Sequence, residues 1–128
     1  MPTPAELLHA ARRARDHAHA PYSRFPVGAA LLTNDGEIFV GANVENASYP
    51  ISMCAERSAL ASAVTHGQRS FAAIAIVGPE GAAISPCGAC RQALAEFGLT
   101  LRVIRENRDD VALSDLLPDA FHFERTGV

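Results

Sequence analysis

Two stretches decide how this chain is organised: Cys54-Ala55-Glu56-Arg57 and Pro86-Cys87-Gly88-Ala89-Cys90. Together they hold all three cysteines of the sequence. Zinc bound by cysteine sulfur is usually tetrahedral, and a site with three protein ligands keeps its fourth position for water. A carboxylate two residues after the first ligand can then reach that water and carry its proton. The spacing therefore predicts a hydrolytic zinc site rather than a structural zinc clip.

The residues of these stretches have distinct expected roles. Cys54, Cys87 and Cys90 are the predicted ligands of one Zn²⁺ per subunit, and Glu56 is the predicted general base and acid. Three thiolates leave Zn²⁺ with a net negative charge, which Arg57 can offset by hydrogen-bonding the sulfurs from the same helix face. The same residues also allow plainer interpretations: buried apolar cysteines, a first-turn Glu held by the helix dipole, and a surface Arg.

Length and composition indicate an ordinary globular protein. The chain has 128 residues, of which 48% are apolar and 20% charged, so residues 1–128 fit a single domain with a real core. A net charge of −3 argues against sequence-independent nucleic-acid binding. The sequence lacks an apolar run that could span a membrane and a signal-peptide core. An odd cysteine count with metal-type spacing indicates reduced thiolates, so we expect a soluble cytoplasmic protein.

The first half of the chain reads as a helix followed by a hairpin. Thr3-Pro4-Ala5-Glu6 predicts a capped helix start, and apolar residues at helical spacing continue the helix until Pro21 stops it. Residues 25–33 and 38–44 are predicted strands, joined by the turn Asn34-Asp35-Gly36. A polar loop follows.

The second half alternates helices and strands. Helices are predicted at 52–66 and 86–97, each closed by a glycine, strands at 71–77 and 100–105, and a helical turn at 113–117. A fifth strand near 110–113 is weakly signalled. The order indicates an α/β fold, a three-layer α-β-α sandwich with a mixed sheet of about five strands whose crossover helices carry the metal ligands.

The two stretches together resemble the cytidine deaminase family, whose signature is ligand-x-Glu followed by Pro-Cys-x-x-Cys. The likeness covers nearly the whole chain, through PYSRFPVGAA at 21–30, GANVENASYP at 41–50 and LLPDAF at 116–121. It is close to the small, homotetrameric, three-cysteine form. The resemblance implies a cytidine deaminase-like fold and hydrolysis of cytidine and deoxycytidine to uridine and deoxyuridine plus ammonia, in pyrimidine salvage. Water bound to zinc would attack C4 of the pyrimidine.

The resemblance also implies how a nucleoside would be held. Asn43 and Glu45 would bind the ribose hydroxyls, and Phe25 would pack against the pyrimidine ring. The backbone N–H of Ala55 would meet the pyrimidine carbonyl, and the backbone carbonyl of Ser85 would meet the amino group. The residues alone also allow the plainer interpretation that Asn43 and Glu45 are ordinary loop residues and Phe25 is an ordinary core residue.

The resemblance further implies an oligomer that completes the active site. Tyr49 and Phe121 would reach the pocket of a neighbouring subunit, so the chain would self-associate as a homotetramer. The histidines show no ligand spacing to the cysteines, and none is assigned to the metal.

Three alternatives remain at this stage. A sister deaminase acting on another cytosine nucleoside, such as an antibiotic, would share the fold and zinc site, although the segment 43–46 favours an ordinary ribose. A polynucleotide-editing deaminase normally carries a His ligand and a basic surface, and this chain has neither. A structural zinc module would need a fourth protein ligand and would give Glu56 no role.

Overall fold

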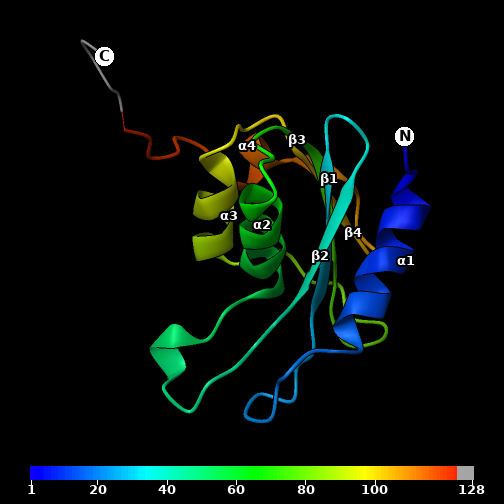
Figure 1. Cartoon of the computed structure of the whole chain (residues 1–128), viewed down its shortest axis with the longest axis vertical. Helices are drawn as coiled ribbons and strands as arrows, with labels where there is room; N and C mark the ends of the chain where they lie inside the picture. Colours follow the sequence, from blue (N-terminus) through cyan, green and yellow to red (C-terminus); the bar gives the residue numbers. More distant parts are fainter. Residues whose placement is uncertain (124–128) are drawn as a thin grey trace.

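A helix and a hairpin come first, and helices and strands follow, in the part of the chain that the structure describes, residues 1–123 of a computed structural model (Figure 1). In chain order the elements are α1 (Pro4–Arg15), β1 (Gly28–Thr33), β2 (Ile38–Ala42), the 3₁₀ turn η1 (Tyr49–Ile51), α2 (Ala55–Thr65), β3 (Phe71–Val77), α3 (Gly88–Ala95), β4 (Arg102–Arg105), β5 (Val111–Ala112) and α4 (Leu113–Leu116).

The strands form one mixed sheet in the order β2-β1-β3-β4-β5. β1 pairs antiparallel with both β2 and β3, and β5 pairs antiparallel with β4. The pair β3–β4 is parallel, and α3 is part of the crossover between them. The predicted mixed sheet of about five strands is therefore confirmed, including its weakly signalled last strand.

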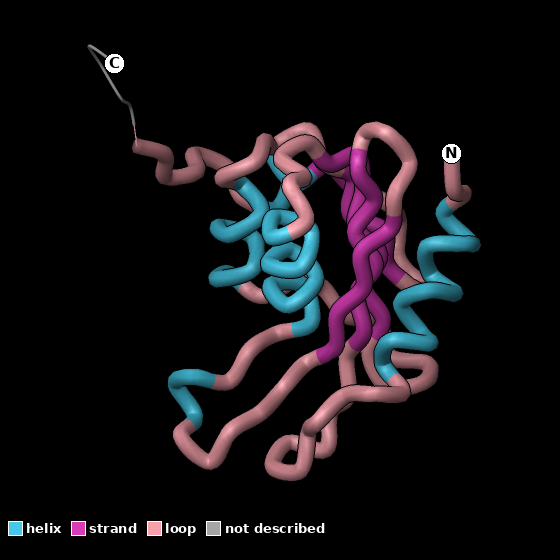
Figure 2. The backbone as a smooth tube through the Cα atoms, in the orientation of Figure 1, coloured by secondary structure: helices cyan, strands magenta, loops and turns pink. Residues whose placement is uncertain are grey.

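Helices cover both faces of the sheet, as Figure 2 shows, with α1 on one face and α2 and α3 on the other. The two faces of β1 alternate as a strand requires: Ala29 and Leu31 belong to the core beneath α2, and Ala30 and Leu32 to the core beneath α1. All six residues of β1 are buried, because helices cover the strand on both sides. The three-layer α-β-α prediction is confirmed. None of the described helices has the length and apolarity that a bilayer crossing requires.

The first helix starts as predicted but ends earlier. The Thr3 hydroxyl accepts the Glu6 N–H at 3.2 Å, and the Glu6 carboxylate accepts the Thr3 N–H at 3.3 Å. The prediction that Pro21 stops the helix was wrong, because α1 ends at Arg15. The chain then turns, and His19 enters an isolated bridge with Val44, which draws these residues out of the helix.

The hairpin strands are also shorter than predicted, starting at Gly28 rather than 25 and ending at Ala42 rather than 44. Val44 pairs with Met53 outside the sheet. The segments before β1 and after β2 therefore extend as long loops beyond one end of the sheet (Figure 2). These loops supply much of the site described next.

Candidate active site

The three cysteines lie at the beginnings of α2 and α3. Cys54 is the N-cap residue of α2, Cys87 is the N-cap residue of α3, and Cys90 lies in the first turn of α3. The predicted helix starts at 52 and 86 were therefore three and two residues early, because α2 begins at Ala55 and α3 at Gly88. Because the first N–H groups of a helix lack intrahelical partners, each cap places its sulfur beside free donors and partial positive charge. The Cys90 N–H indeed donates to the Cys87 sulfur at 3.5 Å.

The three sulfurs have the spacing of a tetrahedral zinc site. The Cys54 and Cys87 Sγ atoms are 3.8 Å apart, the Cys87 and Cys90 Sγ atoms are 3.4 Å apart, and all three lie within 4.8 Å of one another. Tetrahedral zinc with bonds of about 2.3 Å separates its ligand sulfurs by about 3.8 Å. Among residues 1–123, no histidine nitrogen or carboxylate oxygen joins this cluster. The donor set therefore fits Zn²⁺ with one position left for water.

The charge of the thiolates is balanced from the same helix. The Arg57 Nη2 donates to the Cys54 sulfur at 3.5 Å. Hydrogen bonds to the sulfurs, first to Cys54 and then to Cys90, raise the pKa of Arg57. Burial and the nearby Glu56 raise the pKa of Cys90. Burial also acts to raise the pKa of Cys87. The hydrogen bonds that the Cys87 sulfur accepts from Cys90 and shares with Cys54 outweigh the effect of burial, so the pKa of Cys87 is lowered.

Glu56 lies beside this cluster in a setting suited to proton transfer. Its side chain is buried, with 4% of the residue exposed, and it lines the same cavity as Cys54 and Cys87. Burial raises the pKa of Glu56, although hydrogen bonds from its own backbone N–H and from Cys90, and the charge of Arg57, oppose this. A carboxylate whose pKa moves toward neutrality can both accept and return a proton.

A cavity of about 550 Å³ collects most of the predicted site. The predicted residues on its wall are Phe25, Asn43, Glu45, Cys54, Ala55, Glu56, Ser85 and Cys87. Three further residues line it that the sequence did not single out: Ser23, Val27 and Ile84. Ser23 and Val27 lie two residues either side of Phe25, and Ile84 precedes Ser85. Only this closeness in sequence to predicted site residues indicated that these three residues line the cavity.

Asn43 and Glu45 hold the neighbouring loop in place. The Asn43 carboxamide accepts the Val27 N–H at 2.8 Å and donates to the Phe25 carbonyl at 2.9 Å. The Glu45 carboxylate accepts the N–H groups of Tyr22 and Ser23 at 3.0 and 3.1 Å, and the Ser23 hydroxyl. Hydrogen bonds from the hydroxyl and then the N–H of Ser23 lower the pKa of Glu45. Both side chains therefore shape the cavity wall that carries Phe25.

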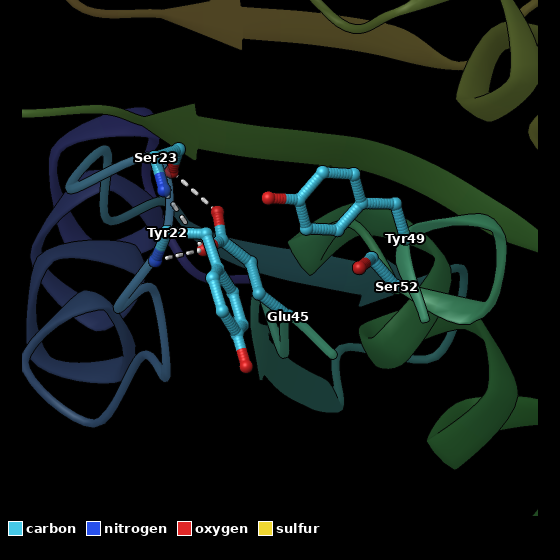
Figure 3. Close-up of a pocket in the computed structure, with 5 residues that line it drawn as sticks. All are labelled: Tyr22, Ser23, Glu45, Tyr49 and Ser52. Atoms are coloured by element: carbon cyan, nitrogen blue, oxygen red, sulfur yellow. Dashed lines mark hydrogen bonds between the residues drawn. The ribbon is translucent and has the colours of Figure 1, made fainter. Parts of the chain in front are cut away.

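Tyr49 and Phe121 do not line this cavity. Tyr49 is 68% exposed and packs edge-on against Tyr22, with ring centroids 5.6 Å apart. Figure 3 shows these two rings with Ser23, Glu45 and Ser52 around a second hollow of about 350 Å³. Ser23 and Glu45 line both the hollow and the main cavity. Phe121 is 72% exposed, and its backbone carbonyl accepts the Gln92 side-chain N–H at 2.9 Å.

Known proteins of the same kind match this chain in sequence and structure. Residues 1–106 match the family model described as the cytidine and deoxycytidylate deaminase zinc-binding region. A cytidine deaminase from Sporosarcina psychrophila is 44% identical over 124 residues, covering 93% of this chain and 91% of the relative. The crystal structure of cytidine deaminase from Burkholderia pseudomallei superposes with a TM-score of 0.87 at 53% identity, covering 94% of this chain and all of that one. Cytidine deaminase from Mycobacterium leprae gives a TM-score of 0.86 at 38% identity over 93% of this chain. The chain therefore belongs to the zinc-binding cytidine and deoxycytidylate deaminase family.

Proposed function

We propose that the chain catalyses the zinc-dependent hydrolysis of cytidine and deoxycytidine to uridine and deoxyuridine with release of ammonia, in pyrimidine salvage. The observation that carries this proposal is that two sulfurs of the cysteine cluster, those of Cys54 and Cys87, share one cavity with buried Glu56. The same cavity is lined by Phe25, Asn43 and Glu45. Residues 1–128 would form a single catalytic domain.

Cys54, Cys87 and Cys90 would hold the zinc, one ion per subunit. Zinc with an open fourth position supplies the Lewis acid that makes water acidic enough to act as a nucleophile near neutral pH. Glu56 would take the proton from the water that adds to C4, and would then deliver a proton to the amino nitrogen that leaves as ammonia. Arg57 would keep the charge of the three thiolates from opposing this ionisation.

The cavity wall supports a neutral nucleoside as the substrate. The N–H of Ala55, the first helical residue of α2, has no intrahelical partner and is available to the pyrimidine carbonyl. The Ser85 backbone carbonyl would accept from the amino group. Phe25 is 42% exposed, which suits a flat base better than a place in the core. Asn43 and Glu45 would bind the ribose hydroxyls.

The residues that line the cavity also favour nucleosides over deoxycytidylate. The wall carries the Glu45 carboxylate and includes neither arginine nor lysine. A phosphate is normally bound by arginine, lysine or a cluster of backbone N–H groups. A sister deaminase of another cytosine nucleoside would use the same wall. A structural zinc module is disfavoured, because no fourth protein ligand joins the sulfurs within residues 1–123.

Self-association and location follow as further parts of the proposal. Tyr49 and Phe121 would complete the pocket of a neighbouring subunit in a homotetramer, and their exposure supports this. Three free cysteines fit a reducing compartment, so the enzyme would act in the cytoplasm.

A direct assay tests the reaction. Purified protein is incubated with cytidine, deoxycytidine and deoxycytidylate, and base conversion and ammonia release are followed with and without a zinc chelator. We expect turnover of both nucleosides, little turnover of the nucleotide, loss of activity with the chelator and recovery when zinc is restored. Zinc-loaded protein that turns over neither nucleoside would overturn the proposal and favour a sister substrate or the structural module.

A further inference from the structure

Two arginines outside the zinc cluster converge on Ser85. Arg91 follows Cys90 on α3, and Arg105 is the last residue of β4. The Ser85 hydroxyl accepts from Arg105 Nη1 at 3.2 Å and from Arg91 Nη2 at 3.5 Å. Ser85 lines the main cavity and lies two residues before the ligand Cys87.

Each guanidinium also binds backbone carbonyls around the same turn. Arg91 Nε donates to the Pro86 carbonyl at 2.7 Å, and its Nη1 donates to the Leu116 carbonyl at 2.8 Å. Arg105 Nη2 donates to the Asp109 carbonyl at 2.8 Å. A planar guanidinium presents its donors in a fixed fork, so these bonds fix direction as well as distance. The turn at Ser85 and Pro86 is thus tied to the end of α4 and to the loop after β4.

Burial of the Arg105 guanidinium is electrostatically unfavourable. Arg105 is 94% buried, since 6% of the residue is exposed, and its Nε has no hydrogen-bond partner among the described residues. Burial, and then the positive charges of Arg108 and Arg91, lower the pKa of Arg105, although the negative charges of Asp109 and Asp110 oppose this. Within residues 1–123, neither Arg91 nor Arg105 forms an ion pair with a carboxylate. A buried cation whose hydrogen bonds all go to neutral oxygens contributes little to stability, which points to a role in placement.

We infer that Arg91 and Arg105 are positioning residues, which fix the Ser85–Pro86 wall of the cavity so that it receives the amino end of the pyrimidine. This inference rests on the proposed function, because it gives the wall a substrate group to receive. Misplacing such a wall by about 1 Å can cost about a hundredfold in rate, even when the zinc ligands and Glu56 are intact.

Lysine substitutions separate the effect of the guanidinium's hydrogen-bond geometry from the effect of its positive charge. R91K and R105K keep the positive charge but cannot reproduce the fork of donors. R102K is the matched control, since Arg102 lies exposed on the same strand as Arg105. For each variant, zinc content, kcat and KM for cytidine, and inhibition by uridine are measured. Uridine carries an oxygen where cytidine carries its amino group, so it reports on the rest of the pocket.

We expect kcat/KM for cytidine to fall about tenfold to hundredfold in R91K and R105K. Zinc content and the uridine inhibition constant should stay within about twofold of the parent protein, because the ligands and ribose contacts are unchanged. S85A should show a smaller loss of the same kind, since Arg91 still binds the Pro86 carbonyl. If either arginine variant fails to fold, S85A is the variant that tests the inference.

Three results would overturn the inference: lysine variants as active as R102K, an unchanged S85A, or parallel losses of zinc, uridine binding and turnover. The last would indicate a merely structural role. Failure of the proposed function is separate, because it would appear as a zinc-loaded parent protein that does not turn over cytidine.

Discussion

Glu56 is the residue on which the proposed chemistry depends most directly. Glu56→Gln keeps the shape of the side chain and removes its ability to carry a proton. We expect kcat to fall about a hundredfold to ten-thousandfold. Zinc content, measured by metal analysis, should not change, because Glu56 is not among the clustered ligand atoms. Glu80→Gln, at an exposed position, is the control. Full turnover by Glu56→Gln protein would remove Glu56 from the mechanism.

Glu45 provides a prediction about pH. Ser23 lowers the pKa of Glu45 from its ordinary value of 4.5, mainly through its hydroxyl. Ser23→Ala should therefore raise this pKa toward 4.5. As pH falls, the variant loses the Glu45 charge before the parent protein does, so its KM for cytidine should begin to rise at a higher pH.

NMR titration of the Glu45 carboxyl carbon, together with KM across the acidic range, measures both effects. Ser52→Ala is the control, since Ser52 lines the same hollow but binds the Asn46 N–H instead of Glu45. Identical Glu45 titrations in the Ser23→Ala and parent proteins would contradict the prediction.

Individual residues differed in how far the sequence could predict their placement. Cys54, Cys87 and Cys90 were predictable as a cluster because metal ligands depend on spacing that is written in the chain. Phe25 owes its placement to the Asn43 carboxamide, a contact between residues 18 apart. The convergence of Arg91 and Arg105 on Ser85 spans up to 20 residues and has no local signal. Only the folded structure brings such partners together.

At the scale of elements, α2 reaches its place because β2 allows a very close approach. A Cβ on Gly41 would lie 2.4 Å from the Ala59 backbone nitrogen and 2.6 Å from the Ala55 carbonyl oxygen. Gly41→Ala should therefore push α2 away from the sheet and lower the free energy of unfolding by about 1–3 kcal/mol. Since α2 begins at the ligand Cys54, zinc affinity should fall as well.

Denaturant unfolding and zinc competition measure these two effects. Gly88→Ala is the control for stability, because a Cβ there meets no atom within 4 Å. An unchanged unfolding free energy for Gly41→Ala protein would show that α2 tolerates the displacement.

The order of elements followed from the sequence, whereas their ends often did not. β3 matches its prediction at both ends, because an apolar run between polar turns has unambiguous limits. α1 ends at Arg15 although helical spacing continues to Ala18, since the His19–Val44 bridge competes for those residues. β1 begins at Gly28 for the same kind of reason, as Asn43 engages the backbone before it. Tertiary contacts decided the ends that local pattern left open.

At the scale of the whole molecule, the cavity is assembled from segments far apart in the chain. Its wall draws on residues 23–27, 43–45, 54–56 and 84–87. The loops around 22–27 and 43–53 extend beyond the sheet (Figure 1). They carry the exposed aromatic side chains of Tyr22, Phe25 and Tyr49. In a single chain, one side of the site therefore borders exposed apolar surface, which is typical of an interaction site.

Association of several chains would cover that surface and, in the homotetramer that we propose, would make activity depend on assembly. We expect the protein to sediment as an oligomer, consistent with the exposure of Tyr49 at 68% and Phe121 at 72%. Tyr49→Ser should shift the population toward smaller species and lower kcat/KM in proportion, because the neighbouring pocket of the proposed homotetramer would lose the Tyr49 side chain. Sedimentation velocity and activity are measured over the same dilution series. Val40→Thr, an isosteric change at a residue 48% exposed on β2, is the control. Full activity in a Tyr49→Ser protein that sediments as a monomer would show that one chain suffices for the site.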